Sequence, residues 1–275
     1  MLNLELIFNK IDELKQLGSV NNELDWKDYN FAKNFYNNVA RNNKQTDSET
    51  KFIIDKLRLK SDAKILDLGC GGGRNCFDLS DHGYKVTGID LSEYAIKEAN
   101  KTKSENNKYK DINFIHKDIL DINYNEEFNA AILIFNHFSS FNNIQVKKLL
   151  KKIHQALTHQ GKILIEISSH NQILSLHGVQ EWAILDSWLA GYFKQLVLID
   201  NIVDNKKEIH IRKDYCVRLS DGQIFEYTQT SYIYDLEKIH ALLRLSGLKL
   251  IQTYGNWQGK IFDDNDDQMI LIIQK

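Results

Sequence analysis

A short apolar run that ends in an acidic residue and a cluster of glycines constrains this chain most. The segment Ile65–Leu68 is apolar except for Asp67 and is stopped by the glycine-rich Gly69–Gly73, which predicts a buried strand and a tight turn. Glycines adopt positive φ angles and leave backbone N–H groups bare, so we expect a ligand to lie against this main chain. A helix predicted to begin near Arg74 directs its unpaired N–H groups at the same place. The sequence therefore predicts a small-molecule site.

Two kinds of cofactor compete for this site. A dinucleotide fingerprint reads Gly-x-Gly-x-x-Gly, but its sixth position is Arg74 here, and Asp67 would face a pyrophosphate unfavourably. A carboxylate at the end of the strand suits a cationic ligand better. The next predicted strand, Tyr84–Ile89, is followed by Asp90, which is placed to accept hydrogen bonds from two ribose hydroxyls. A nucleoside that carries a cation and no phosphate describes S-adenosylmethionine.

Several segments resemble the class I S-adenosylmethionine-dependent methyltransferases, in particular those of the bacterial small-molecule type. The resemblance covers most of the chain from Thr46 onward. It implies an α/β fold with a Rossmann-like, seven-stranded, mostly parallel sheet, helices on both faces and an antiparallel β cap inserted after strand 5. The segments that carry it are Ile65–Ser92, Phe114–Ile119, Phe128–Phe135, Gln160–Glu166 and Tyr232–Gly255.

The resemblance also implies which residues bind the cofactor. Asp67 is expected to meet the methionine ammonium, Asp90 to bind the ribose, and Phe135 to line the methionine tail. An acid and an apolar residue after the third strand are expected to frame the adenine. The implied set is Asp67, Gly69, Cys70, Gly71, Asp90, Leu91, Asp118, Ile119 and Phe135. The donor is then S-adenosyl-L-methionine, and S-adenosyl-L-homocysteine is its product.

The chain is expected to contain three parts. Residues 1–45 form a helical lid, in which apolar residues between Asn3 and Leu17 recur at helical spacing and aromatic residues follow from Trp26; docking of the N-terminus onto the core is the alternative. Residues 46–168 and 232–275 form the methyltransferase core, which starts with a capping box of Thr46 and Glu49. Residues 169–231 form the β insertion, which is expected to cap the acceptor.

The insertion reads as an irregular stretch followed by three strands. These strands are predicted near Phe193–Val203, Glu208–Leu219 and Gln223–Ser231, with turn residues between them. Open α/β sheets bind ligands beyond the carboxyl ends of their strands, so we expect such a cap to close over the acceptor. A dimer interface made from the same strands is the alternative. The residues predicted to contact the acceptor are Tyr29, Asn136, Arg212, Tyr215 and Tyr232.

The composition and charge of the chain argue against several classes of protein. A formal net charge of -2 gives no electrostatic footprint for nucleic acid, and no apolar run reaches the length of a membrane span. Acidic residues near the N-terminus argue against a signal peptide. Three scattered cysteines suit neither a disulfide framework nor a zinc site, so we expect no metal and a cytoplasmic setting. The chain has no proline, which excludes the Pro-Pro-Tyr and Pro-Cys motifs of DNA methyltransferases.

Methyl transfer from a sulfonium is an in-line displacement that needs no metal. Holding the acceptor in line with the methyl group can remove much of the activation barrier. An amine acceptor must first lose a proton, so a general base is useful. His137 follows the fourth strand and has a side-chain pKa that spans neutrality, which makes it the best candidate base. A histidine that is hydrogen-bonded to the backbone and forms a wall of the pocket is the alternative. Glu166 and His170, at the end of the fifth strand, are the other catalytic candidates, although Glu166 is equally suited to holding a neighbouring loop.

The predicted function is N-methylation of a small-molecule acceptor, by a monomer or by a homodimer formed through the β insertion. O-methylation of a small hydroxylated metabolite is the next choice within the enzymes, and C-methylation of an acidic carbon is a third. Two other classes compete with these: a nicotinamide-dependent dehydrogenase, and a non-catalytic protein that binds S-adenosylmethionine. Arg74 and the in-strand Asp67 argue against the dehydrogenase.

Overall fold

The computed structural model describes residues 11, 20–23, 25, 27–38 and 43–275 of the chain. The chain divides into two compact units: an insertion unit, Met1–Ala40 with Leu174–Ser231, and a core unit, Arg41–Ile173 with Tyr232–Lys275. The predicted helix from Asn3 to Leu17 lies outside the described residues except for Ile11, and so does Trp26. No helix within the described residues is long and apolar enough to cross a membrane.

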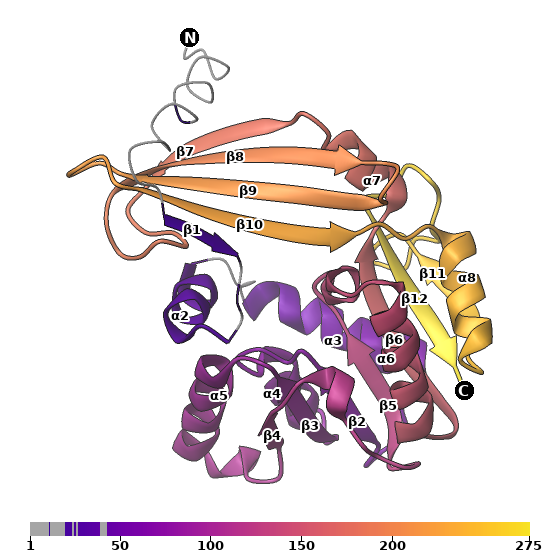
Figure 1. Ribbon diagram of the computed structural model, residues 1–275. Helices are drawn as coiled ribbons and strands as arrows, with labels where there is room; N and C mark the ends of the chain where they lie inside the picture. The colour runs from indigo at the N-terminus through magenta and orange to yellow at the C-terminus, as the bar shows by residue number, and fades with distance from the viewer. Residues whose placement is uncertain (1–10, 12–19, 24, 26, 39–42) are drawn as a thin grey trace. The chain divides into compact units, whose positions relative to one another are not determined.

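A seven-stranded mixed sheet forms the centre of the core unit, which confirms the predicted fold class. Its strand order is β11-β12-β6-β5-β2-β3-β4, as Figure 1 shows. The five strands from β4 to β6 run parallel, β12 runs antiparallel to β6, and β11 runs antiparallel to β12. The strands are β2 (Lys64–Leu68), β3 (Lys85–Asp90), β4 (Asn113–His116), β5 (Phe128–Leu133), β6 (Leu157–Ser168), β11 (Lys249–Tyr254) and β12 (Gln268–Gln274).

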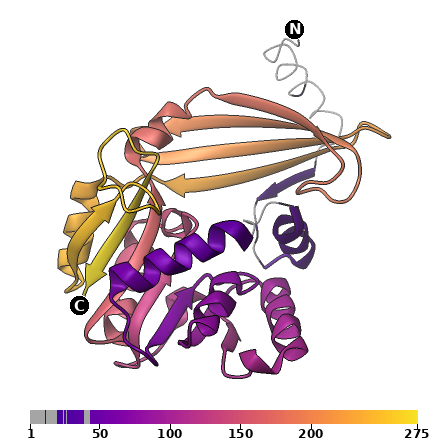
Figure 2. The same cartoon turned by 180° about the vertical axis from the view of Figure 1, so that it is seen from behind.

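Helices cover both faces of this sheet. On one face, α6 (Asn143–Ala156) and α8 (Leu236–Leu245) pack against side chains such as Leu66 and Leu271. On the other, α3 (Asn43–Leu57), α4 (Arg74–Asp81) and α5 (Glu93–Glu105) pack against side chains such as Ile65 and Ile132 (Figure 2). Because both faces are buried, strands such as β2 and β5 are mostly apolar, as the sequence of β2 already indicated. Short helical segments are η1 (Asn107–Tyr109), η2 (Ile119–Asp121), η3 (His137–Ser140) and α7 (His170–Ser175).

The N-terminus of α3 differs from the prediction. The helix begins at Asn43, so Thr46 lies inside it and the predicted capping box of Thr46 and Glu49 is wrong. Glu49 is buried and forms an ion pair with Arg74, at 2.6 Å between Oε2 and Nη1. Arg74 opens α4 directly after the glycine turn. The residue that breaks the dinucleotide fingerprint therefore ties α4 to α3, a role that requires the folded chain.

The insertion unit contains a five-stranded sheet of order β1-β10-β9-β8-β7 (Figure 1). Its strands are β1 (Val20–Glu23), β7 (Gln180–Leu185), β8 (Gln195–Asp204), β9 (Ile209–Arg218) and β10 (Ile224–Tyr232). The last three agree with the predicted strands. The prediction missed β7, whose residues are exposed or half-buried, and β1, which pairs with β10 in parallel. The helix α2 (Tyr29–Asn38) places Phe31 in a cluster with Val197, Cys216 and Tyr227.

Candidate active site

The glycine turn between β2 and α4 uses its backbone donors internally. The N–H groups of Gly69 and Cys70 both donate to the carbonyl of Ile89, at 2.7 and 3.0 Å. The N–H of Gly71 donates to the carboxylate of Asp90 at 2.8 Å. The prediction that these positions leave bare N–H groups for a ligand is therefore wrong, because the neighbouring strand β3 accepts them. Three of the four glycines, Gly69, Gly71 and Gly73, do adopt positive φ angles.

Asp90 ends β3 and holds two segments of backbone. Its Oδ2 accepts the hydrogen bond from Gly71, and its Oδ1 accepts one from the N–H of Ser92 at 2.8 Å. Ser92 in turn caps α5 by accepting from the N–H of Ala95. A carboxylate has about four acceptor sites, so each oxygen of Asp90 retains one. The arrangement fixes the carboxylate while leaving it able to accept the two ribose hydroxyls predicted for it.

Asp67 is a deeply buried carboxylate in β2, only 2% exposed. Its Oδ2 accepts a hydrogen bond from the thiol of Cys76 at 3.2 Å. Burial raises the pKa of Asp67 to about 7, although the Cys76 hydrogen bond and the charge of Arg74 lower it and the charge of Asp90 raises it. An ionised carboxylate in such a place gains from a cationic ligand, because a neighbouring positive charge offsets the cost of its burial. Asp67 therefore suits the ammonium of a bound amino acid.

The backbone after β5 is strained and held from the neighbouring strand. Phe135 and Asn136 have φ angles of 64° and 55°, a left-handed conformation that costs a non-glycine residue roughly 1–2 kcal/mol. The buried carboxylate of Glu166 accepts from the N–H of Phe135 at 2.6 Å, and the Asn136 amide oxygen accepts from the N–H of Ser168 at 3.0 Å. Both contacts come from β6. The turn leaves the Phe135 side chain 41% exposed at the carboxyl edge of the sheet.

This strained turn delivers His137 to the glycine turn. A Cβ built on Gly69 would lie 2.1 Å from Nδ1 of His137, so the imidazole occupies the space that a side chain would need. His137 is half-buried. This burial lowers the pKa of His137, whereas the charges of Asp90 and Asp118 and a hydrogen bond to the Leu68 backbone raise it. The surface over Gly69, predicted to face the cofactor, is therefore covered by an imidazole.

The remaining predicted cofactor residues lie around this cluster with different exposures. Asp118 opens η2, where its Oδ1 accepts from the N–H of Leu120 at 2.8 Å. The side chain of Ile119 is buried in the hydrophobic core, and Cys70 is buried beside the turn. Leu91 is half-buried, and its carbonyl lies 2.9 Å from a ring nitrogen of His116. Asp118 and His137 are close enough to interact electrostatically, so the structure joins the predicted adenine acid to the glycine turn.

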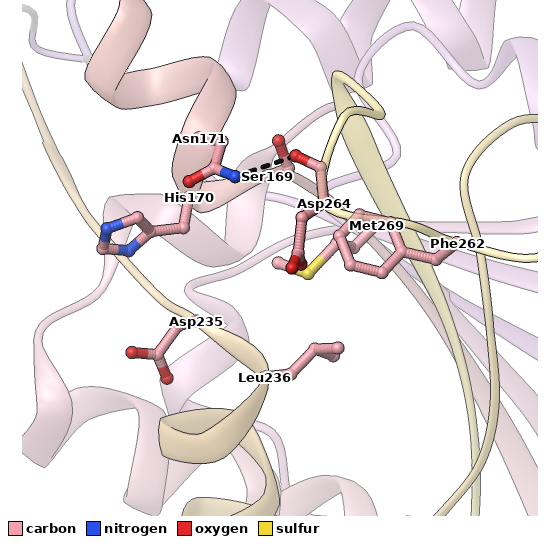
Figure 3. A pocket seen from close by; sticks show the side chains of 8 residues that line it. All are labelled: Ser169, His170, Asn171, Asp235, Leu236, Phe262, Asp264 and Met269. Atoms are coloured by element: carbon pink, nitrogen blue, oxygen red, sulfur yellow. Dashed lines mark hydrogen bonds between the residues drawn. The ribbon is translucent and has the colours of Figure 1, made fainter.

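His170 lines a separate cavity of about 220 Å³ at the same edge of the sheet (Figure 3). Asp235 and Asp264 also line it, and neither carboxylate forms an ion pair with another described residue. The buried Met269 lies beside Asp264, and Asn171 donates to the Asp264 carbonyl at 2.9 Å. The other lining residues are Ser169, Leu236 and Phe262. The cavity thus combines an acidic rim with apolar walls, and it lies beyond β6 and β12 rather than at the glycine turn.

The predicted acceptor residues of the insertion unit do not share one face. Arg212 and Tyr215 are three residues apart on β9, so their side chains point to opposite faces of the sheet. The guanidinium of Arg212 forms two hydrogen bonds with Asp214, at 2.8 and 2.9 Å, whereas Tyr215 is buried. Tyr29 is exposed on α2. Tyr232, the last residue of β10, packs against the hydrophobic core of the core unit.

Two residues of the site were missed by the sequence analysis. Cys76 donates to Asp67, and Gly88 leaves room for sulfur atoms beside it. The Gly-x-Gly segment drew attention to the turn, but Cys76 lies in the following helix and Gly88 in the next strand. The signal that could have found them is the spacing of a cysteine one helical turn after the last glycine, on the face that α4 turns toward β2.

A parallel sheet whose first strand delivers a buried acid into a glycine turn, and whose second strand ends in an acid with free acceptor sites, defines a class of enzyme. The chain is similar to the class I S-adenosylmethionine-dependent methyltransferases and shares their fold. Residues 65–161 match the family model described as a methyltransferase domain. The cofactor of this class is S-adenosylmethionine, and the residues present fit it. Asp67 forms no ion pair with another described residue, and Asp90 retains two acceptor sites for hydroxyls.

Two relatives and one solved structure illustrate the likeness. The chain is 25% identical over 211 residues to the putative methyltransferase YqeM of Bacillus subtilis, which covers 74% of this chain and 80% of YqeM. It is 27% identical over 226 residues to the phosphoethanolamine N-methyltransferase of Plasmodium falciparum, which covers 78% of each. The crystal structure of an S-adenosylmethionine-dependent methyltransferase from Clostridium acetobutylicum has the same fold, with a TM-score of 0.72, 18% identity, and coverage of 89% of this chain and 97% of that one.

Proposed function

We propose that this protein transfers the methyl group of S-adenosylmethionine to the nitrogen of a small-molecule amine. The observation that carries the proposal is the contact of the His137 imidazole with the glycine turn, where a Cβ on Gly69 would lie 2.1 Å from Nδ1. An acceptor that arrives as an ammonium must lose a proton before it can attack, so a proton acceptor beside the donor site is useful. The site therefore combines residues for binding the methyl donor with a residue that can remove the proton from an amine acceptor.

The donor would be held by the residues around the turn. Asp67 faces the methionine ammonium, Asp90 accepts the ribose hydroxyls, and Asp118 lies toward the adenine. S-adenosylmethionine supplies an electrophilic methyl group on a sulfonium. The exposed Phe135 side chain, fixed by the strained turn after β5, gives the methionine tail an apolar wall.

His137 is suited to take the proton of the acceptor. An amine with a lysine-like pKa lies about three units above neutrality, so freeing its lone pair costs roughly 4 kcal/mol. Burial lowers the pKa of His137 and so favours the neutral ring, whereas the charges of Asp90 and Asp118 act in the opposite direction. A neutral imidazole has one ring nitrogen that donates and one that accepts, so His137 can accept a proton. The amine nitrogen, once deprotonated, attacks the methyl carbon in line as the carbon–sulfur bond breaks and its electrons return to sulfur.

The preference for an amine rests on two further observations. The cavity lined by His170, Asp235 and Asp264 has a rim that attracts cations, and it lies at the carboxyl edge of the same sheet as the glycine turn. Neighbouring strands are about 4.8 Å apart, so the cavity is roughly 10–14 Å from β2, within reach of the far end of a small acceptor. A relative that matches 78% of this chain is named an N-methyltransferase.

The test is a methylation assay with paired acceptors. The protein is incubated with S-adenosylmethionine and a panel of amines, each paired with the alcohol of the same carbon skeleton, and products are detected by mass spectrometry. We expect methylated amines and no methylated alcohols, and we expect Asp90→Ala to abolish both donor binding and product. Methylation of alcohols alone would favour O-methylation instead. Donor binding without any methylated product across the panel would favour the non-catalytic binding protein.

A further inference from the structure

The thiol of Cys76 lies beside the carboxylate of Asp67, the residue assigned to the ammonium of S-adenosylmethionine. Cys76 lies in the first turn of α4, is completely buried, and has its Sγ 3.2 Å from Oδ2 of Asp67. Burial raises the pKa of Cys76 well above its usual value, so the group stays a protonated thiol at neutral pH. It is therefore a permanent hydrogen-bond donor toward Asp67.

The neighbouring strand makes room for this thiol. Gly88 on β3 is the register partner of Asp67 on β2. A Cβ on Gly88 would lie 2.8 Å from Sγ of Cys76 and 2.8 Å from Sγ of Cys70, so both sulfur atoms fill the volume that its missing side chain leaves. Gly88 shows no positive φ, and space rather than backbone conformation requires a glycine there. The pair of thiols is thus packed into the sheet at the level of the acid.

The groups that face Asp67 come from every element around it. From α4 come the Cys76 thiol and the charge of Arg74, both of which favour the ionised carboxylate. Strand β3 contributes the charge of Asp90, which disfavours it, and β5 contributes the apolar Ile132 in register. Arg74 is already paired with a glutamate of α3. The Cys76 thiol is the larger of the two favourable contributions to the ionised Asp67.

We propose that Cys76 is a positioning residue for donor binding, because its Sγ–H bond to Asp67 Oδ2 holds that carboxylate ionised and oriented for the ammonium of S-adenosylmethionine. The inference rests on the proposed function for the contact between Asp67 and the donor, and goes beyond it in assigning the neighbouring thiol. No covalent step is involved, and the thiol keeps its proton throughout.

The experiment measures donor affinity against pH in the full-length protein. Dissociation constants for S-adenosylmethionine and S-adenosylhomocysteine are determined by calorimetry from pH 5.5 to 9 for wild type, Cys76→Ala and Cys76→Ser. A hydrogen bond to a charged group is worth about one pH unit, so we expect the acidic limb of Cys76→Ala to move up by about one unit. Its affinity should be about tenfold weaker near pH 6 and nearly unchanged near pH 9. Cys76→Ser keeps a donor and should retain the wild-type midpoint.

The matched control is Cys216→Ala, which truncates an equally buried cysteine in the insertion unit and should leave the pH dependence unchanged. If Cys76→Ala weakened the affinity for S-adenosylmethionine equally at every pH, Cys76 would act only through packing and the inference would be overturned. An unchanged midpoint of the pH dependence of this affinity would overturn it as well. Carbon-13 NMR titration of the aspartate carboxylates in the ligand-free protein separates the two proposals. A shifted Asp67 midpoint in Cys76→Ala supports the role of the thiol, whereas a wild type that binds neither ligand overturns the proposed function and the donor half of the inference.

Discussion

The imidazole of His137 rests on the α carbon of Gly69, so close that a Cβ there would fall 2.1 Å from Nδ1. Gly69 belongs to the turn after β2, and His137 follows the strained turn after β5. This contact ties the predicted base to the predicted donor turn. A glycine is therefore needed at position 69 for two reasons: its φ of 77°, and the space that the His137 ring occupies.

Substitution of Gly69 tests this contact. Gly69→Ala should displace the His137 ring and cost about 2 kcal/mol or more of stability, with a large loss of turnover, because backbone strain and steric overlap add. Gly83→Ala is the matched control, since Gly83 has a φ of 88° and open space around its Cβ position. Thermal unfolding of both variants separates the two costs. Equal destabilisation would show that the His137 ring moves away freely.

Removal of the imidazole tests the proton transfer. His137→Gln should lower kcat by about 10²–10³-fold at pH 7, with both substrates saturating, because the ammonium of the acceptor loses its proton acceptor. The deficit should shrink as pH rises toward the pKa of the amine, where solvent deprotonates it. Burial lowers the pKa of His137, so the wild-type acidic limb of kcat should lie below pH 6.5. A pH-independent deficit would remove His137 from proton transfer.

Asp67 should make stability depend on pH. Its pKa rises from 3.8 to about 7 in the folded state, so its contribution to stability is complete below pH 3.8 and is lost as pH rises through 7. The loss is at most roughly 4 kcal/mol. Asp67→Asn carries no charge, so its melting temperature should exceed that of wild type above pH 7 and equal it near pH 4. Differential scanning calorimetry across this range decides the matter, and a constant difference at all pH values would contradict the buried ionisation.

Glu166 can be tested for a catalytic role against a structural role in holding the turn after β5. Its carboxylate accepts from the N–H of Phe135 at 2.6 Å, inside a backbone turn with two left-handed residues. Glu166→Gln keeps an acceptor oxygen and should retain most of the turnover. Glu166→Ala leaves a backbone donor unpaired and should cost about 1–3 kcal/mol of unfolding free energy, together with turnover. Loss of turnover in Glu166→Gln with unchanged stability would assign the carboxylate to catalysis instead.

The local elements of the donor site could be predicted from the chain itself. An apolar strand that ends in Asp67, glycines with positive φ and a helix from Arg74 onward are set within one short stretch of sequence. Asp90 follows from the next strand by the same periodicity. These features depend on neighbours along the chain, so the sequence contains their cause. The three long strands of the insertion were predictable for the same reason, whereas β7 lacked a buried alternation and β1 has only four residues.

The sequence by itself determined the class of fold and the donor, and it predicted the acids that would bind this donor. Tertiary structure decided the contacts of those residues. Groups at the end of β3 accept hydrogen bonds from the backbone of the glycine turn. Cys76 donates a hydrogen bond to Asp67, and His137 covers Gly69. The same folding separates Arg212 from Tyr215 and places His170 in a cavity beyond β6. The physical reason is that these contacts join strands and loops far apart in the chain. Sheet order and packing bring them together, and no local pattern records either.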